Sequence, residues 1–162
     1  MSPLPFGSSI KILTDKQSYG LGEYIRFSVT VKMDKAVKAR GVYAYLICRE
    51  TKKEHISSYM TDDEVRWKEQ LGEVVTNRVI TREKETKHEP WHIEVKLAGP
   101  GYYKDETFTG KVRIPEGGMP TSYEFGHDNK INIWYLKVKI DIPMAFDLNA
   151  EKEILVRGLS VH

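Results

Sequence analysis

The stretch GYYKDETFTGKVRIPEGGMPTSYEFGHDNKINIWYLKVKIDIPMAFD, residues 101–147, decides the fold class. Within it, residues 107–114 alternate between polar and apolar side chains, which is typical of a half-buried strand; the apolar side carries Phe108, Val112 and Ile114. Residues 131–142 repeat this period over a longer run, whose apolar side carries Trp134, Leu136, Val138, Ile140 and Ile142. The stretch therefore predicts two strands of a sheet with one wet face.

Glycines and prolines separate these two runs and supply the backbone angles that turns require; they are Pro115, Gly117, Gly118, Pro120 and Gly126. A further glycine, Gly110, interrupts the apolar side of the first run. An isolated glycine inside a strand marks a bulge or a close approach of the backbone to another group.

The rest of the chain also shows the strand period. Residues 24–33 alternate most regularly, and their inward side is Ile25, Phe27, Val29, Val31 and Met33. Residues 41–49 are apolar on both sides, so we expect a central strand or one that is covered on both faces. Shorter runs predict further strands at residues 8–15, 73–88, 91–97 and 153–161. The charged second half of residues 73–88 suits a sheet edge, where Lys and Glu discourage pairing with other chains.

Two segments between the strands are ambiguous. Residues 50–60 are expected to continue the sheet as the return strand of a hairpin, through Ile56 and Tyr59. In residues 61–72, Thr61 with Glu64 three positions later resembles a capping box, so that a short helix and an irregular loop both fit.

These patterns predict an all-β fold, an antiparallel immunoglobulin-like β-sandwich with at most one short helix, and one domain over residues 1–162. A single sheet closed on itself is the structural alternative.

Composition limits the function. The 25 basic and 23 acidic residues are interspersed and give a net charge of +2, so there is no clustered basic face of the kind that nucleic acid requires. The single cysteine, Cys48, excludes an intramolecular disulfide and a multi-cysteine metal site. No secretory leader and no apolar run of membrane-spanning length is evident. We therefore expect a cytoplasmic protein without an integral membrane segment.

The five residues His88-Glu89-Pro90-Trp91-His92 match the zinc-protease motif HExxH. That chemistry needs a helix, on which both imidazoles reach one metal ion. Pro90 disfavours helical angles at the preceding residue, and the flanking segments have the strand period, so we expect a turn between two strands instead.

No other group of residues predicts chemistry. His55, His127 and His162 lie apart from one another, and Cys48 sits in an apolar strand, where a buried small side chain is expected. We therefore expect no catalytic, cofactor-binding or metal-binding residue, no cofactor and no enzymatic activity.

The order of these segments resembles the N-terminal domain of the arrestin family, which includes α-arrestins, Vps26-like proteins and bacterial sporulation-control relatives. The matching segments are the DKQSYGLGE turn at residues 15–23, the strands at residues 24–33 and 40–46, the segment at residues 108–115 followed by MPTSY at residues 119–123, and the strand at residues 131–143. The resemblance implies two packed immunoglobulin-like sheets. It also implies a non-enzymatic adaptor that binds protein partners, of the trafficking or signalling type, through loops or an edge strand.

The sequence departs from the family in three ways. Typical members carry two sandwiches in tandem and this sequence has room for one, so we expect self-association to cover the surface that a second domain would bury. It contains no Pro-Pro pair and so lacks the PPxY motif of α-arrestins. We also find no buried ionic cluster of the kind that serves phosphate recognition. The alternative function is a module for sugar or lipid with Trp67, Trp91 and Tyr103 as an aromatic platform.

Overall fold

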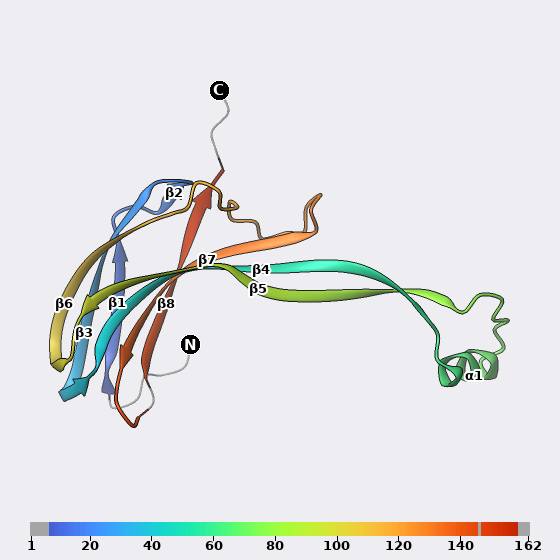
Figure 1. Cartoon of the computed structure of the whole chain (residues 1–162), viewed down its shortest axis with the longest axis horizontal. Helices are drawn as coiled ribbons and strands as arrows, with labels where there is room; N and C mark the ends of the chain where they lie inside the picture. Colours follow the sequence, from blue (N-terminus) through green and yellow to red (C-terminus); the bar gives the residue numbers. More distant parts are fainter. Residues whose placement is uncertain (1–6, 146, 159–162) are drawn as a thin grey trace.

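The computed structural model describes residues 7–145 and 147–158, which form two packed sheets and a long projecting hairpin (Figure 1). The three-stranded sheet has the order β1 (Ser9–Thr14), β3 (Tyr24–Ala39) and β6 (Gly101–Arg113). The five-stranded sheet has the order β2 (Ser18–Gly20), β8 (Leu148–Arg157), β7 (Lys130–Asp141), β4 (Gly41–Tyr59) and β5 (Val79–Ala98). All strand pairs are antiparallel except β2 with β8. The predicted all-β sandwich is therefore confirmed.

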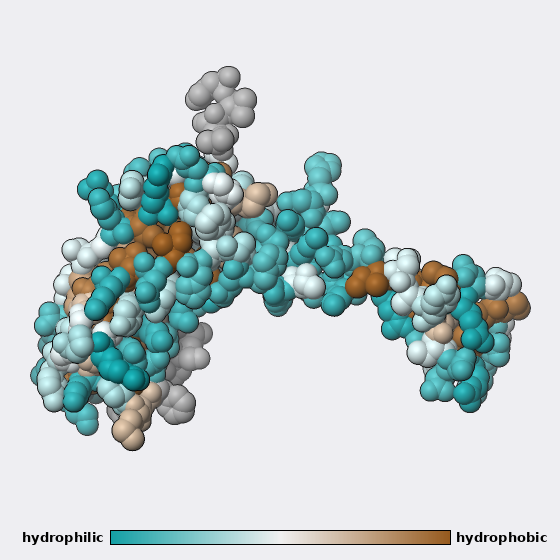
Figure 2. Space-filling view, viewed as in Figure 1, coloured by the Kyte–Doolittle hydropathy of each residue, from teal (hydrophilic) through white to brown (hydrophobic). Residues whose placement is uncertain are grey.

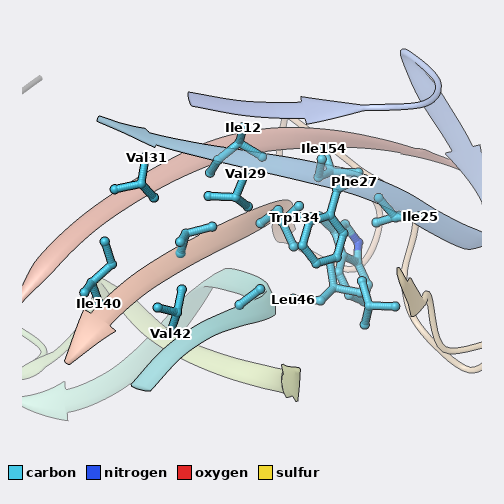
Figure 3. Close-up of a cluster of buried hydrophobic side chains, with 14 of the residues drawn as sticks. Ile12, Ile25, Phe27, Val29, Val31, Val42, Leu46, Trp134, Ile140 and Ile154 are labelled. Atoms are coloured by element: carbon cyan, nitrogen blue, oxygen red, sulfur yellow. The ribbon is translucent and has the colours of Figure 1, made fainter. Parts of the chain in front are cut away.

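The core lies between the two sheets and is made by the inward sides that the alternation predicts (Figure 3). In β3 and β7 every predicted inward side chain is buried, and in β4 the same holds for Val42, Ala44, Leu46 and Cys48. Trp134 is the largest fully buried side chain, and its indole Nε1 donates to the backbone oxygen of Met119 at 2.8 Å. The period of the sequence was thus sufficient to assign the faces of these strands.

Gly110 marks a close approach and not a bulge. It pairs directly with Phe27, and the register between β3 and β6 is continuous there. A Cβ atom at this position would lie 2.7 Å from Cζ of Phe27 and 2.9 Å from Cδ2 of Leu97. The glycine lets the two sheets meet at this edge of the core.

Three expectations about strand boundaries were wrong. Residues 73–88 and 91–97 are not two strands around a turn, because β5 runs without interruption from Val79 to Ala98 and residues 73–78 are not in a strand. Residues 50–60 do not return as a hairpin; β4 continues straight through them and ends at Tyr59. The closing strand begins at Leu148, five residues before the predicted start at residue 153; residues 159–161 of the prediction lie outside the described residues. In each case long-range pairing, which the local period does not encode, sets the boundary.

The projecting hairpin begins at the first residue of β7, Lys130, where the pairing of β4 with β7 stops. Lys52 is the last residue of β4 that pairs with β7, whereas the pairing of β4 with β5 continues as far as Tyr59 opposite Val79. At about 3.3 Å per residue, the seven residues beyond Lys52 extend the ribbon about 23 Å past the sandwich. The helix α1 (Asp62–Gln70) lies at its far end (Figure 1). We call residues 53–85 the arm.

Candidate functional site

The shaft of the arm is a two-stranded ribbon with polar side chains on both faces. Lys84 lies opposite Glu54 and Glu85 opposite Lys53, while Nζ of Lys53 also lies 3.1 Å from Oε1 of Glu83. Cross-strand charge pairs of this kind stabilise a ribbon only weakly, and an isolated two-stranded ribbon is marginally stable in water. The shaft therefore contributes little to the stability of the sandwich and exposes most of its own surface.

The ladder changes register at the root of the arm. Cys48 pairs with Trp91 and Glu50 with His88, which leaves Glu89 and Pro90 of β5 opposite Arg49 alone. Pro90 has no N–H group to donate, so a bulge on an edge strand is where a sheet tolerates it. This break separates the part of β5 that packs on the core from the part that forms the arm.

Arg49 holds the outer face of the root together. Its Nη1 and Nη2 atoms donate to the two carboxylate oxygens of Glu151 at 3.1 and 2.6 Å, its Nε atom lies 3.6 Å from Oε1 of Glu89, and its guanidinium lies 4.6 Å from the ring centre of Tyr135. The hydrogen bonds from Arg49 hold the pKa of the Glu151 carboxyl below its ordinary value. The bond to Glu151 also raises the pKa of Arg49. The contacts tie β4, β5 and β8 together.

A second polar group lies on the core side of the root. Glu50 is 6% exposed, and its Oε1 atom lies 3.2 Å from Nε2 of His88 and 3.7 Å from Nζ of Lys130. Asn132, directly opposite Glu50 on β7, is 2% exposed and its Oδ1 atom has no hydrogen-bond donor among the described residues. These groups lie at the end of the sandwich where β7 begins.

The register also places the two histidines of the HExxH match on opposite faces of the sheet. His88 lies opposite Glu50, which shares the core face with Cys48, whereas His92 lies opposite Ile47 on the other face. His92 contacts Glu89 at 3.3 Å, and the segment is strand and not helix. The two imidazoles do not face one metal ion, and no group of three metal-ligating side chains is found in the part of the chain that the structure describes.

The tip of the arm is a small folded unit of its own. Thr61 caps α1, with its Oγ1 atom accepting from the backbone N–H of Glu64 at 3.3 Å while the Glu64 carboxylate accepts from the backbone N–H of Thr61 at 3.4 Å. Val65 and Met60 are buried beneath the helix. The carboxylate of Glu64 also forms an ion pair with Arg82 on β5. The predicted capping box is confirmed, and of the two structures that fit residues 61–72, the helix forms.

The tip exposes large apolar side chains. Trp67 is 64% exposed, and Leu71, the C-cap residue that follows α1, is 62% exposed; because they are four positions apart, they lie on the same side of the helix end. Val74, in the segment that follows the helix, is 86% exposed. Figure 2 shows hydrophobic residues gathered at the far end of the arm. We call Trp67, Leu71 and Val74 the tip patch.

The outer face of the three-stranded sheet is basic. Where the three strands pair in continuous register, at residues 9–13, 24–32 and 105–113, the outward residues include one acidic residue, Asp105, and five exposed basic residues, Lys11, Arg26, Lys32, Lys111 and Arg113. Among the described residues only Arg113 of these five forms a salt bridge, with Glu116. Two exposed apolar side chains, Leu13 and Tyr24, lie on the same face. A hollow of about 520 Å³ opens there between Leu13, Arg26 and Lys111. We call this surface the basic face.

The residues that carry the family resemblance serve the fold. In the turn after β1, the hydroxyl of buried Tyr19 donates to Oδ1 of Asp15 at 2.5 Å and accepts from the backbone N–H of Lys16 at 3.0 Å. The hydrogen bond from Tyr19 lowers the pKa of Asp15. In the MPTSY segment, Thr121 binds the backbone of Val156 on β8 through both its N–H group and its hydroxyl. These residues position turns and do not form a binding site.

The aromatic platform of the alternative function is not assembled. Trp67 lies at the tip of the arm, whereas Trp91 on β5 and Tyr103 on β6 are half-buried against the core. The hydroxyl of Tyr103 donates to the backbone oxygen of Gly99 at 2.5 Å. These three aromatics do not share a groove in the described structure.

The single cysteine and the histidines outside the HExxH match are the remaining residues that the sequence analysis considered. Cys48 is 1% exposed, and burial raises the pKa of its thiol to about 11. His55 and His127 are exposed, and His162 lies outside the described residues.

No helix among the described residues has the length and apolar character to cross a membrane. The exposed surfaces of the arm and of the three-stranded sheet are therefore the candidate sites, and sequence reasoning missed both because neither contains a motif.

The fold and these surfaces define a two-sheet β-sandwich that carries a projecting hairpin. A solved structure of the sporulation control protein Spo0M from Bacillus subtilis is similar to it, with a TM-score of 0.59 and 16% sequence identity over 92% of this chain and 49% of that chain. At this identity the similarity concerns the fold alone, and this chain spans about half the length of that protein. The sequence matches no family model and no curated protein.

Proposed function

We propose that the protein is a non-enzymatic adaptor that binds protein partners through its arm, in the cytoplasm. The observation that carries this proposal is the arm itself, a ribbon exposed on both faces that ends in an apolar tip and adds little to the core. A surface that adds little stability and buries little within its own chain is suited to contacts with another molecule. The arrestin-like fold of the sandwich supports the same class of function.

The route of binding is the addition of a partner strand to the free edge of β5. β5 is the last strand of the five-stranded sheet, so its outer edge presents unpaired N–H and C=O groups. Along the arm, Glu83 and Glu85 point to one face, whereas Arg82 and Lys84 point to the other. A complementary strand therefore carries basic side chains on the first face and acidic side chains on the second.

A second copy of β5 does not meet this requirement at the middle of the arm. In an antiparallel pairing of two copies, residues opposite each other lie on the same face of the sheet. Centred on Glu83, such a pairing places Glu83 opposite Glu83 and Arg82 opposite Lys84; centred on Lys84, it places Glu83 opposite Glu85. Like charges opposite each other are destabilising. The free edge of β5 is therefore better suited to pairing with a strand of a different protein than with β5 of a second copy.

The experiment compares three immobilised proteins in one native extract: the wild type, a variant in which residues 55–83 are replaced by Asn-Gly, and the double variant Glu83→Lys/Glu85→Lys. We expect a partner that the wild type retains, that the shortened variant loses and that the charge-reversed variant binds much more weakly. The matched control is Glu106→Lys, a charge reversal at an exposed position outside the arm. Equal retention by the wild type and the shortened variant would contradict a role for the arm.

A further inference from the structure

We propose that the tip patch of one molecule docks on the basic face of a second copy, so that the chain assembles head to tail. This inference concerns assembly and goes beyond the proposed adaptor function. It does not depend on the free edge of β5.

The exposed side chains of the tip are complementary to a surface that combines apolar and basic side chains. Trp67 and Leu71 lie on the same side of the end of α1, and Val74 follows, so three large apolar side chains are exposed within eight residues. Between Tyr59 and Arg78 the tip carries five acidic residues against three basic ones. Of these acidic residues, Asp62, Asp63 and Glu64 form ion pairs with Arg78, Arg66 and Arg82. Glu69 and Glu73 are exposed and form no salt bridge among the described residues, so they carry the uncompensated negative charge of the tip. A complementary surface therefore combines apolar side chains with an excess of positive charge.

The basic face has this composition. Leu13 and Tyr24 supply exposed apolar surface, and Lys111 lies 5.2 Å from the ring centre of Tyr24. Lys11, Arg26 and Lys111 form no salt bridge among the described residues, so each can receive a carboxylate of the tip. The hollow beside Leu13 is bordered by the small side chains of Ser28 and Thr109, and also by Asp15, whose carboxylate accepts from the hydroxyl of Tyr19 and the backbone N–H of Arg26. An apolar side chain from the tip can enter there while carboxylates contact its basic rim.

The shape of the molecule makes this contact intermolecular. The three-stranded sheet and the tip of the arm lie at opposite ends of the molecule (Figure 1). The basic face points away from the five-stranded sheet, from which the arm emerges. A tip therefore reaches the basic face of another molecule and not its own. Because the two contacting surfaces differ, the interface is heterologous, and such interfaces extend into open chains unless the rotation closes a ring.

Contact between two tips is the main competing arrangement. It would also bury Trp67 and Leu71, but it would bring the acidic excess of one tip against that of the other. Contact between two basic faces would likewise bring basic side chains against basic side chains. Only the mixed contact satisfies both the apolar and the charged groups.

Sedimentation velocity over a protein concentration range of about 10 to about 500 µM tests the proposal, because a small interface of this kind is expected to be weak. We expect species that grow with concentration beyond a dimer and that dissociate in high salt. The tip variant Trp67→Ala/Leu71→Ala and the face variant Arg26→Glu/Lys111→Glu should each raise the dissociation constant by at least about tenfold. Leu155→Ala and Lys96→Glu/Lys137→Glu are matched controls outside both surfaces and should associate as the wild type does.

Mixing the two deficient variants decides the arrangement. Each retains one intact surface, so an equimolar mixture should form a dimer of one molecule of each variant and should stop there. Association of the face variant at wild-type strength would show contact between tips and overturn the proposal, as would a wild type that remains monomeric throughout. Circular dichroism of each variant shows that it is folded, since all four substituted residues are exposed.

Discussion

Residues on the inner faces of the sheets determine how closely the two layers approach. Gly110 is one position of close approach, because its missing side chain makes room for Phe27 and Leu97. The sequence showed that the glycine interrupts an apolar face, and it offered a bulge and a close approach as explanations. The structure decides for the close approach, since the choice depends on what lies across the core.

Gly110→Ala is therefore expected to lower the free energy of unfolding by about 1 to 3 kcal/mol, as overpacked core positions do. Gly99→Ala is the matched control, because a Cβ there meets no atom within 4 Å, and we expect no loss of stability. Urea unfolding followed by tryptophan fluorescence measures both. Equal stability of the two variants would mean that Phe27 and Leu97 move aside freely.

Glu151 gives a pH-dependent prediction at the same scale. Its pKa is below the ordinary value because of the hydrogen bonds from Arg49. A carboxyl whose pKa is lower in the folded state stabilises the protein above its pKa in the unfolded state, and this contribution disappears as the pH falls through the folded-state value. Because the side chain is 36% exposed, the ion pair contributes only about 0.5 kcal/mol.

We therefore expect Glu151→Gln to be slightly less stable than the wild type at pH 7 and to differ less from it as the pH falls below 4. Thermal unfolding from pH 3 to pH 7 measures the difference. Glu106→Gln, at an exposed position, should follow the wild-type curve throughout. A difference for Glu151→Gln that grows with acidity would contradict the assigned role of Arg49.

At the scale of elements, the arm is the feature that local patterns missed. Near the sandwich both strands carry charge on both faces, and farther out Ile56 and Ile80 lie on one face while Tyr59 and Val79 lie on the other. Residues 53–59 and 79–85 therefore lack the continuous apolar side that the core strands show. That absence was available in the sequence as a sign of exposure. The length of the hairpin was not, because it depends on where β7 stops pairing with β4.

The arm should be separable from the sandwich. Beyond Glu54 and Lys84 the two strands pair only with each other, so replacing residues 55–83 with an Asn-Gly turn removes no contact between the sheets. We expect this variant to fold and to unfold cooperatively at a temperature within a few degrees of the wild type. Differential scanning calorimetry measures it. Loss of the cooperative transition would show that the arm stabilises the core.

The helix at the tip depends on its cap. Thr61→Ala removes the hydroxyl that accepts from the backbone of Glu64, which should cost about 1 kcal/mol of local stability. Hydrogen exchange of the amides of α1 should then be about fivefold faster, while amides of β3 and β7 are unchanged. Thr76→Ala, at an exposed position after the helix, is the control. Unchanged exchange in Thr61→Ala would show that burial of Val65 alone holds the helix.

At the scale of the whole molecule, the arm makes the chain longer than a compact protein of its size. A compact chain of 162 residues has a radius of gyration of about 15 Å. We expect small-angle scattering from dilute protein to give a clearly larger value, and the variant shortened at residues 55–83 to fall to about 14 Å. A value near 15 Å for the wild type would mean that the arm folds back on the sandwich in solution.

The sequence by itself determined where the core strands lie, which of their sides face the core, and which residue caps the short helix. These features repeat with the period of the backbone, so a few neighbouring residues suffice to specify them. Only the tertiary structure decided that β4 and β5 run on past the core, that His88 and His92 face opposite sides, and that the basic residues of β1, β3 and β6 share one face. Each of these depends on which strand lies beside which and in what register, and pairing between residues distant in the chain leaves no local periodic signal.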